Sequence, residues 1–279
     1  MVFDCFMFWK ELDMLELRLR HMWEHVDEFV IVEADRTFRG APKPLFFLEN
    51  KSRFAWAMPK IHHVLVNMPE NHSEYWGMEG IQRDGIMTGV MGALPEDYVL
   101  ISDVDELPRY HEMRVAMERC VHEGPVALVL TKHHWKLNNR MDTTLPGSEH
   151  HYPWHSFTVC QRRHLRFPEE PATMGWTPQQ IRDRRCAWPS VNHGGWHFSF
   201  IGDEFFNQEK IKAFSHSEYD TPEFTDPEKI KQRIQALDVD PFERGYRYRV
   251  EAITPEEYPD EVVNNIEKYT KLGWIAEVS

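Results

Sequence analysis

Short apolar runs separated by amphipathic stretches organise the first hundred residues. Buried strands are predicted at residues 2–8, 28–34, 61–66 and 98–102, because each run is largely apolar and of strand length. An amphipathic helix is predicted from Glu11, where apolar residues recur at steps of three and four: Leu12, Leu15, Leu19, Met22 and Val26. A turn-rich loop is expected at 35–44, a short helix at 49–57 and a longer helix at 73–91.

This alternation of strands and helices predicts an α/β fold with a mostly parallel, Rossmann-like sheet flanked by helices. Ligands of such sheets bind beyond the carboxyl ends of the strands. Three segments are therefore expected to form the binding region: Phe8–Glu11, Glu33–Gly40 and Ser102–Leu107.

The second half of the chain is less regular. Strands are predicted at 126–130 and 157–161, a glycine-rich patch at Gly194-Gly195, and helices near 208–214, 227–237 and 259–272. Because no internal repeat or low-complexity tract divides the chain, a single body is expected. Its three segments would be 1–124, 125–220 and a helical extension at 221–279.

Charge and composition narrow the function classes. The 279 residues carry 45 acidic and 32 basic side chains, a formal net charge of −13, which speaks against a general nucleic-acid or anionic-membrane binder. Neither a signal peptide nor an apolar run of about 18 residues is seen, so a soluble, cytoplasmic protein is expected. The four cysteines show no C-x-x-C spacing and are expected to be buried free thiols.

The strand at 98–102 ends in Asp103-Val104-Asp105-Glu106, which places two carboxylates at i and i+2 just beyond a buried strand. Such oxygen ligands suit Mg²⁺ or Mn²⁺, and a cation there neutralises charge on a leaving diphosphate. The alternative is a solvated acidic turn before the helix that follows Pro108. Arg83 has two interpretations as well: an i,i+4 salt bridge with Glu79, or a guanidinium beside Asp103 that grips phosphate.

In order along the chain, these motifs resemble glycosyltransferase family 17, the β-1,4-N-acetylglucosaminyltransferases. The resemblance covers residues 3–219 and rests on these blocks: Phe3-Asp4-Cys5-Phe6, Glu11-Leu12-Asp13, Phe29–Glu33, Thr37-Phe38, Gly40 with Lys43-Pro44-Leu45, Trp76, Glu79, Gln82-Arg83, Ile101–Pro108, Gly194–Ser199, Lys212, Phe214-Ser215-His216 and Glu218-Tyr219. Without a membrane anchor at its start, the sequence is similar to soluble microbial or viral members.

The family resemblance implies a GT-A-type fold, a UDP-sugar donor, a glycan acceptor, a divalent metal (Mn²⁺ or Mg²⁺) and inversion at the anomeric carbon. The first candidate for the donor is UDP-GlcNAc. The resemblance implies a metal site at Asp103, Asp105 and His216, with Asp105 the direct ligand, Asp103 shared with donor hydroxyls, and His197 as the rival of His216. It makes 1–124 the nucleotide-sugar-binding half and 125–220 the acceptor-side half. The donor-binding residues it implies are Phe8, Glu11, Glu33, Thr37, Arg83, Asp84, Asp103 and Val104.

The acceptor side is expected at Gly195, Trp196 and His197. Glycines allow a backbone to approach a ligand closely, and an indole face suits the C–H side of a pyranose. The alternative is a core Trp beside a tight turn. An inverting transfer needs a general base, for which Glu204 is the first choice and Asp203 the second. This acidic pair departs from the family pattern, a single acidic residue one position later, and its alternative role is a helix N-terminus favoured by the macrodipole.

Two other functions remain open from the sequence. A lectin-like protein without catalysis would account for ten tryptophans. A metal-dependent phosphohydrolase could use the same carboxylates, but haloacid-dehalogenase-like enzymes carry Asp-x-Asp-x-Thr/Val on their first strand, whereas this motif follows a later one. Calorimetry separates the classes, because a transferase binds UDP with metal dependence and a lectin binds glycan instead.

Overall fold

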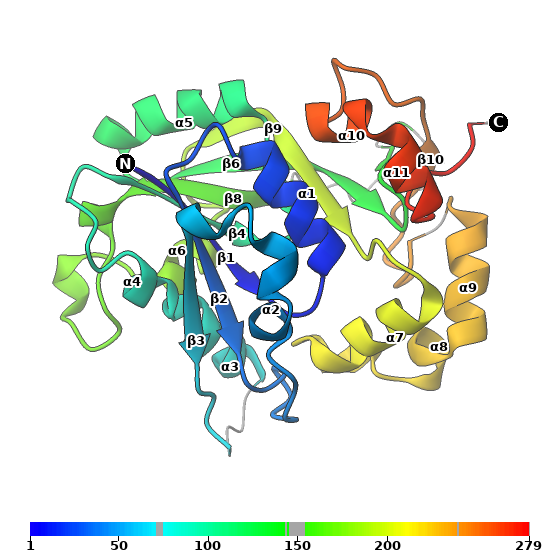
Figure 1. Ribbon diagram of the computed structural model, residues 1–279, viewed down its shortest axis with the longest axis horizontal. Helices are drawn as coiled ribbons and strands as arrows, with labels where there is room; N and C mark the ends of the chain where they lie inside the picture. Colours follow the sequence, from blue (N-terminus) through cyan, green and yellow to red (C-terminus); the bar gives the residue numbers. More distant parts are fainter. Residues whose placement is uncertain (71–74, 143, 145–153, 239, 279) are drawn as a thin grey trace. The chain divides into compact units, whose positions relative to one another are not determined.

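The computed structural model describes residues 1–70, 75–142, 144, 154–238 and 240–278 (Figure 1). These residues group into two compact units that are interleaved along the chain. Unit 1 contains Met1–Leu130 and His155–Gly195, and unit 2 contains Thr131–Trp154 and Trp196–Ser279. The single body and the segment boundaries predicted from the sequence stay predictions. In the described part of the chain, no helix has both the length and the apolar character that a membrane crossing requires.

Unit 1 contains the four parallel strands that the sequence predicts. They are β1 (Val2–Phe8), β2 (Glu28–Ala34), β3 (Ile61–Val66) and β4 (Tyr98–Asp103), in the order β3-β2-β1-β4. Strand β8 (Trp154–Gln161) joins the free edge of β4 antiparallel. The α/β fold with a Rossmann-like group of parallel strands is thus confirmed, but the sheet is mixed and not mostly parallel, because further strands join it antiparallel. Because the strand order reverses between β1 and β4, the carboxyl ends of these two strands form a topological switch point, where α/β sheets bind ligands.

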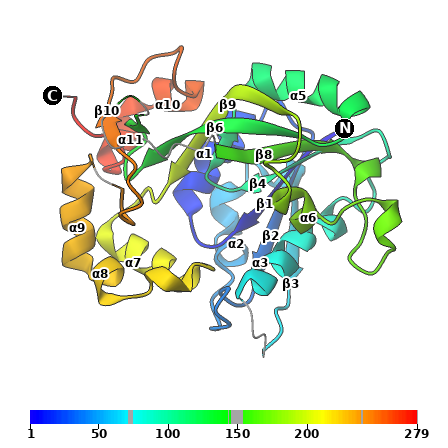
Figure 2. The ribbon, with the colours of Figure 1, turned by 180° about the vertical axis from the view of Figure 1, so that it is seen from behind.

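Helices cover both faces of this sheet. On one face, α1 (Leu12–Met22) and α2 (Phe46–Glu49) pack on alternate β1 residues, with Arg18 on Asp4 and Phe47 on Phe8. On the other face, α4 (Ile86–Gly89) and α6 (Pro178–Asp183) pack on the β1 residues between them, in a core cluster that includes Cys5. Figure 2 shows this second face, where α3 (Tyr75–Asp84) lies with α6.

Several helices of unit 1 differ from the prediction. The helix expected at 49–57 begins earlier, as α2, because the Glu33 carboxylate accepts the amides of Phe47 and Leu48; a 3-10 turn at Lys51–Phe54 follows. The helix expected at 73–91 is split into α3 and α4 at Gly85, and residues 73 and 74 lie outside the described residues. A Cβ at Gly85 would lie 2.7 Å from Val66, so this close approach requires glycine.

The remaining elements of unit 1 follow β4. They are β5 (Glu106–Pro108), α5 (Tyr110–Glu123), the start of β6 (Val126–His134) and most of β9 (Ser190–Ser199). Strands β6 and β8 are longer than predicted, and the expected glycine-rich patch is part of β9, which pairs with β5 and β6. The helix α6 was not predicted from the sequence.

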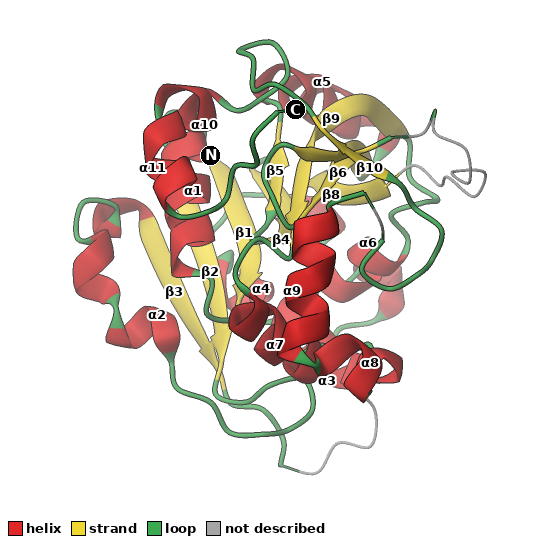
Figure 3. Cartoon of the chain, turned by 90° about the vertical axis from the view of Figure 1, so that its right-hand side faces the viewer, coloured by secondary structure: helices red, strands yellow, loops and turns green. Residues whose placement is uncertain are grey.

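Unit 2 contains a small antiparallel pair and two groups of helices. The strands are β7 (Asn139–Met141) and β10 (Tyr248–Val250). Helices α7 (Glu204–Ala213), α8 (Pro222–Thr225) and α9 (Pro227–Ala236) contact one another (Figure 3) around an apolar cluster that contains Phe200 and Phe242. The helix expected at 227–237 is confirmed. That expected at 208–214 begins at Glu204, where Asp203 caps it, and that expected at 259–272 is split into α10 (Asp260–Asn264) and α11 (Ile266–Lys271).

Candidate functional site

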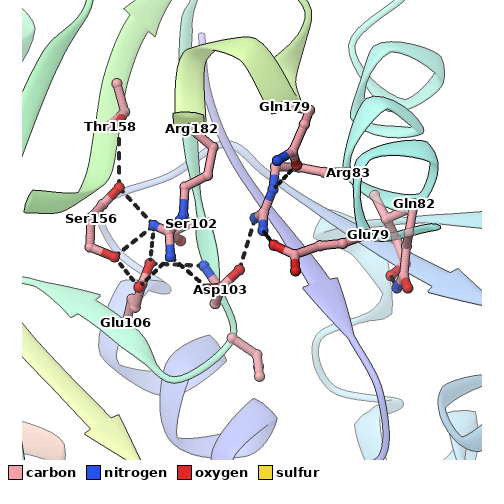
Figure 4. A network of polar contacts seen from close by, with 12 residues as sticks. Glu79, Gln82, Arg83, Ser102, Asp103, Glu106, Ser156, Thr158, Gln179 and Arg182 are labelled. Carbon is pink, nitrogen blue, oxygen red and sulfur yellow. Dashed lines mark hydrogen bonds and ion pairs between the residues drawn. The ribbon is translucent and has the colours of Figure 1, made fainter. Parts of the chain in front are cut away.

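Asp103 is the last residue of β4 and lies at the switch point of the unit 1 sheet. Its carboxylate is held by two guanidinium groups: Oδ1 accepts from Arg83 at 2.8 Å, and Oδ2 accepts from Arg182 at 2.7 Å (Figure 4). The Asp103 side chain is 31% exposed, whereas both arginine side chains are buried. The strand therefore presents a carboxylate that solvent or a ligand can reach between two buried positive charges.

Arg83 comes from α3 and contacts both Glu79 and Asp103, whereas its grip on a phosphate stays a prediction. It donates to Glu79 at 2.7 Å, which is the i,i+4 salt bridge, and to Asp103 across the sheet edge. Its Nε donates to Gln179 of α6 at 2.8 Å. Burial lowers the pKa of Arg83, but the charges of Asp103 and Glu79 outweigh it and hold this pKa above its usual value. The guanidinium is therefore always charged.

A second network, which sequence reasoning missed, lies on the other side of Asp103. Arg182 forms a bidentate pair with the fully buried Glu106, at 2.9 and 2.8 Å, and also donates to the backbone oxygen of Ser156 at 2.8 Å. Glu106 in turn accepts the Asp103 amide at 3.0 Å. The one sequence signal for α6 is its capping box, in which Thr177 accepts the Gln180 amide and Gln180 reaches back to Thr177.

A third buried guanidinium supports the loop after β4 from the α1 side. Arg18 donates to the backbone oxygens of Asp103 at 2.9 Å and Glu106 at 2.7 Å, and lies 3.5 Å from that of Val104. Its remaining donors bind the buried carboxylate of Asp4 and the hydroxyl of Ser102. The backbone of the acidic loop is thus fixed by α1, whereas the Asp103 side chain is fixed by α3 and α6.

The donor set at the end of β4 fits a hard divalent cation. The Asp103 side chain is 31% exposed, and Asp105 adds a second carboxylate, 6% exposed. Among the described residues, no group of three or more His, Cys, Asp or Glu side chains could hold a metal. A cation here would rest on the two carboxylates and complete its shell with diphosphate oxygens and water, which is a usual arrangement for Mg²⁺.

The predicted donor-binding residues at the ends of β1 and β2 have partners of their own. Phe8 is buried against Phe47, and Glu11 is half-buried at the start of α1. Glu33 is fully buried, accepts the α2 amides and lies 3.0 Å from His63. Thr37 accepts the Ala41 amide in the loop after β2. Their contact with a nucleotide stays a prediction.

Asp84, the last residue of α3, holds that helix to α6. Its carboxylate accepts the Gln179 amide at 2.8 Å. Burial raises the pKa of Asp84 above its usual value, although hydrogen bonds from Gln179 and Thr177 act in the opposite direction. The structure therefore shows a structural role for Asp84, and its predicted donor contact stays a prediction.

The glycine pair of β9 serves close packing between strands. Gly195 has φ of +146°, and a Cβ there would lie 2.0 Å from the backbone oxygen of Leu107 in β5. A Cβ at Gly194 would lie 2.5 Å from Leu128 in β6. Close packing between strands therefore accounts for both glycines, and a ligand that approaches the backbone is not required.

The Trp196 and His197 side chains belong to unit 2 and differ in exposure. Trp196 is 4% exposed, and its indole N–H donates to the backbone oxygen of Glu257 at 2.7 Å, which favours the interpretation as a core Trp. His197 is half-buried and stacks on Trp154 at 5.2 Å with an interplanar angle of 13°. Of the two, His197 is the one whose surface a ligand could reach.

The last predicted residues are also in unit 2. Asp203 is the N-cap of α7, where its Oδ1 accepts the Phe206 amide at 2.7 Å, so the helix-terminus alternative holds for this residue. Glu204 is the first residue of α7 and is half-buried. His216 is exposed and pairs with Glu218 at 2.7 Å. The catalytic and metal-binding roles of these residues stay predictions.

The paired carboxylates lie at the switch point of the parallel strands in an α/β fold. Proteins of this class bind ligands, nucleotides among them, beyond the carboxyl ends of their strands. More specifically, the chain belongs to glycosyltransferase family 17, whose profile matches residues 1–142. This match confirms the resemblance over residues 1–142, which include the parallel strands and the acidic loop of the site; the later blocks, from Gly194 on, lie outside the match.

Two curated relatives carry the name β-1,4-mannosyl-glycoprotein 4-β-N-acetylglucosaminyltransferase. Those of Homo sapiens and Rattus norvegicus are each 29% identical over 107 residues, 35% of this chain. The matched region spans 20% of the length of either relative. A solved mannosyltransferase from Pyrobaculum calidifontis, in complex with GDP-Man and Mn²⁺, matches with a TM-score of 0.41 and 14% identity over 84% of this chain and 69% of its own.

Proposed function

We propose that the protein is a metal-dependent, inverting glycosyltransferase that moves a sugar from a UDP donor to a hydroxyl of a glycan. The first candidate for this sugar is GlcNAc. The observation that carries the proposal is the placement of Asp103 and Asp105. In a member of glycosyltransferase family 17, these carboxylates follow the strand at the switch point, and a buried, charged Arg83 contacts the first of them.

The two carboxylates and Arg83 would share the diphosphate of the donor. A bound Mn²⁺ or Mg²⁺ would supply neutralisation of the charge that develops on the leaving UDP. Asp105 would be the direct ligand, and Asp103, which accepts from two arginines, would be shared with hydroxyls of the donor. Arg83 carries a permanent charge and a planar fork that matches phosphate geometry. It would hold a diphosphate oxygen beside Asp103.

The acceptor hydroxyl must lose its proton as its oxygen attacks the anomeric carbon opposite the leaving diphosphate. Glu204 is the proposed base. Asp203 is the weaker candidate, because its carboxylate is used as the N-cap of α7. Within the predicted acceptor segment, His197 has reachable surface and would contact the sugar, whereas burial of Trp196 limits it to supporting that segment.

The proposal is tested with Asp105→Ala and a matched control, Asp27→Ala. Asp27 is exposed and lies just before β2, at the amino ends of the parallel strands, whereas Asp105 follows the carboxyl end of β4. Thermal-shift and calorimetric measurements with UDP and UDP-GlcNAc, with and without Mn²⁺, give binding; release of UDP in the presence of a glycan gives transfer. Ligands that bind only the native state raise the melting temperature.

The wild type and Asp27→Ala are expected to bind UDP only with the metal. Asp105→Ala is expected to remain folded and to lose turnover by roughly 100-fold or more. Wild-type turnover in Asp105→Ala would contradict the metal assignment. Binding of glycan without any binding of UDP would show a lectin-like protein instead.

A further inference from the structure

The short helix α6 reaches the acidic loop through two side chains. Gln179 supports Arg83 at 2.8 Å, and Arg182 contacts Asp103 itself at 2.7 Å. The helix is fixed to α3 by the hydrogen bond between the Gln179 amide and Asp84. A segment far from the acidic loop in the sequence therefore determines where the Asp103 carboxylate lies.

Both terminal nitrogens of Arg182 donate to acceptors within the protein and are not available to a ligand. One terminal nitrogen donates to Glu106 at 2.9 Å and to the backbone oxygen and hydroxyl of Ser156 at 2.8 and 2.6 Å. The other donates to Glu106 at 2.8 Å and to Asp103. The Arg182 side chain is 7% exposed, and that of Glu106 is fully buried. The guanidinium is thus a fixed part of the protein interior with one edge on the site.

The same pair holds Asp103 at two places. Glu106 accepts the Asp103 amide at 3.0 Å, which fixes the backbone, and Arg182 binds Oδ2, which fixes the side-chain rotamer. Figure 4 shows Arg182 between Ser156 and Asp103, with Glu106 beneath it. Partners of this kind orient the carboxylates that touch a metal or ligand, and their loss typically weakens metal affinity by 10–100-fold.

We propose that Arg182, paired with Glu106, is a positioning residue that holds Asp103 in its binding orientation. The inference rests on the proposed function, since it assigns the orientation of Asp103 a role in metal-dependent donor binding. Arg83 cannot replace Arg182, because Arg83 divides its donors among Glu79, Gln179 and Asp103. If Arg83 turns toward a diphosphate, Arg182 still keeps the carboxylate in place.

Arg182→Lys is the sharpest variant. It keeps a positive charge in the buried network but loses the planar fork that spans Glu106 and Asp103 together. The matched control is Arg166→Lys. Arg166 lies in the same unit, is 6% exposed, and donates to the backbone oxygens of Phe167, Pro168 and Glu170 and to the Gln180 side chain of α6, none of which belongs to the acidic loop. Both variants lose a buried guanidinium, so any general loss of stability is shared.

The measurement is UDP binding by calorimetry as a function of Mn²⁺ concentration, together with Mn²⁺ binding by electron paramagnetic resonance. Arg182→Lys is expected to raise the Mn²⁺ concentration for half-maximal UDP binding by roughly 10-fold or more, and Arg166→Lys to change it less than about twofold. In an Asp103→Asn background, Arg182→Lys should add less than about twofold, because Arg182 acts through that carboxylate.

The inference is overturned if Arg182→Lys behaves as Arg166→Lys does, or if its effect is undiminished in the Asp103→Asn background; the proposed function stands in both cases. If the wild type binds neither Mn²⁺ nor UDP, the proposed function fails and the positioning role fails with it. Should Arg182→Lys not fold, Glu106→Gln gives the same test. It removes the charge opposite Arg182 with little change of shape, and the same rise in Mn²⁺ requirement is expected.

Discussion

Arg18 of α1 and Asp4 of β1 form a fully buried ion pair, and the Arg18 donors that do not contact Asp4 support the acidic loop. Arg18 Nε lies 2.9 Å from Asp4 Oδ2, and a terminal nitrogen lies 2.5 Å from Oδ1. The other terminal nitrogen donates to the backbone oxygens of Asp103 and Glu106. The pair therefore connects the first strand and helix of the chain to the loop that carries the site.

Arg18→Met is expected to destabilise the protein by about 3–5 kcal/mol, because it leaves Asp4 charged and without its partner in the interior. Arg20→Met is the control on the same helix. Arg20 pairs with Glu16 near solvent, at 3.0 Å with a 42% exposed side chain, and such pairs contribute about 1 kcal/mol or less. Chemical denaturation measures both variants. Equal unfolding midpoints would show that the buried pair carries no more stability than the surface one.

Gly195→Ala tests why a glycine stands in β9. The new Cβ would meet the Leu107 oxygen at 2.0 Å, in a backbone conformation that L-residues rarely adopt, so a loss of about 3 kcal/mol or more is expected. Gly92→Ala is the control, since nothing lies within 4 Å of its Cβ position; a change within about 1 kcal/mol is expected there. If Gly195 serves a ligand instead, the variant would unfold like the wild type and lose only acceptor binding.

Trp196→Phe separates packing from sugar contact. The indole N–H bond to Glu257 and part of a buried ring are lost, so the unfolding free energy should fall by about 1–3 kcal/mol. The acceptor KM should change less than about twofold. His197→Ala is the comparison, with little loss of stability and a raised acceptor KM. A Trp196→Phe variant with wild-type stability and a strongly raised KM would restore Trp196 as the sugar platform.

The sequence predicts the parallel half of unit 1 well because its signals are local. The bounds of β1, β2 and β3 are those expected, and β4 is one residue longer than expected. Each strand is a short apolar run, and α1 shows its stripe within eleven residues. Arg83 beside Asp103 was one of the two interpretations that the sequence left open, and the structure shows this contact.

The rest of the site depends on contacts between distant segments. Residues 178–183 form a short, largely polar helix, and its importance arises only from Arg182 meeting Glu106 and Gln179 meeting Arg83. On the face of the sheet that α1 covers, Asp4 is a signal of the site that sequence reasoning missed. An acidic residue inside a buried strand requires a buried cation, and Arg18 is polar within the apolar stripe of α1.

The cysteines give a prediction that depends on pH. Cys5, Cys120 and Cys160 are buried and Cys186 is exposed. Burial raises the pKa of Cys120 to about 12 and also raises those of Cys5 and Cys160. Because the thiolate is the reactive form, a thiol reagent at pH 8 should modify Cys186 rapidly and the other three only on unfolding. Cys186→Ser should therefore abolish the rapid phase.

The same shifts fix the sign of the alkaline response. In the unfolded chain thiols ionise near pH 8.5, whereas the buried native thiols stay protonated, so above that pH the native state binds more protons. The free energy of unfolding is then unaffected by these groups at pH 7 and falls as pH rises through about 9. Denaturation at pH 7 and pH 10 should show a smaller fall for Cys160→Ala than for wild type. Equal falls, or four thiols reacting at one rate in the native protein, would contradict burial as the cause.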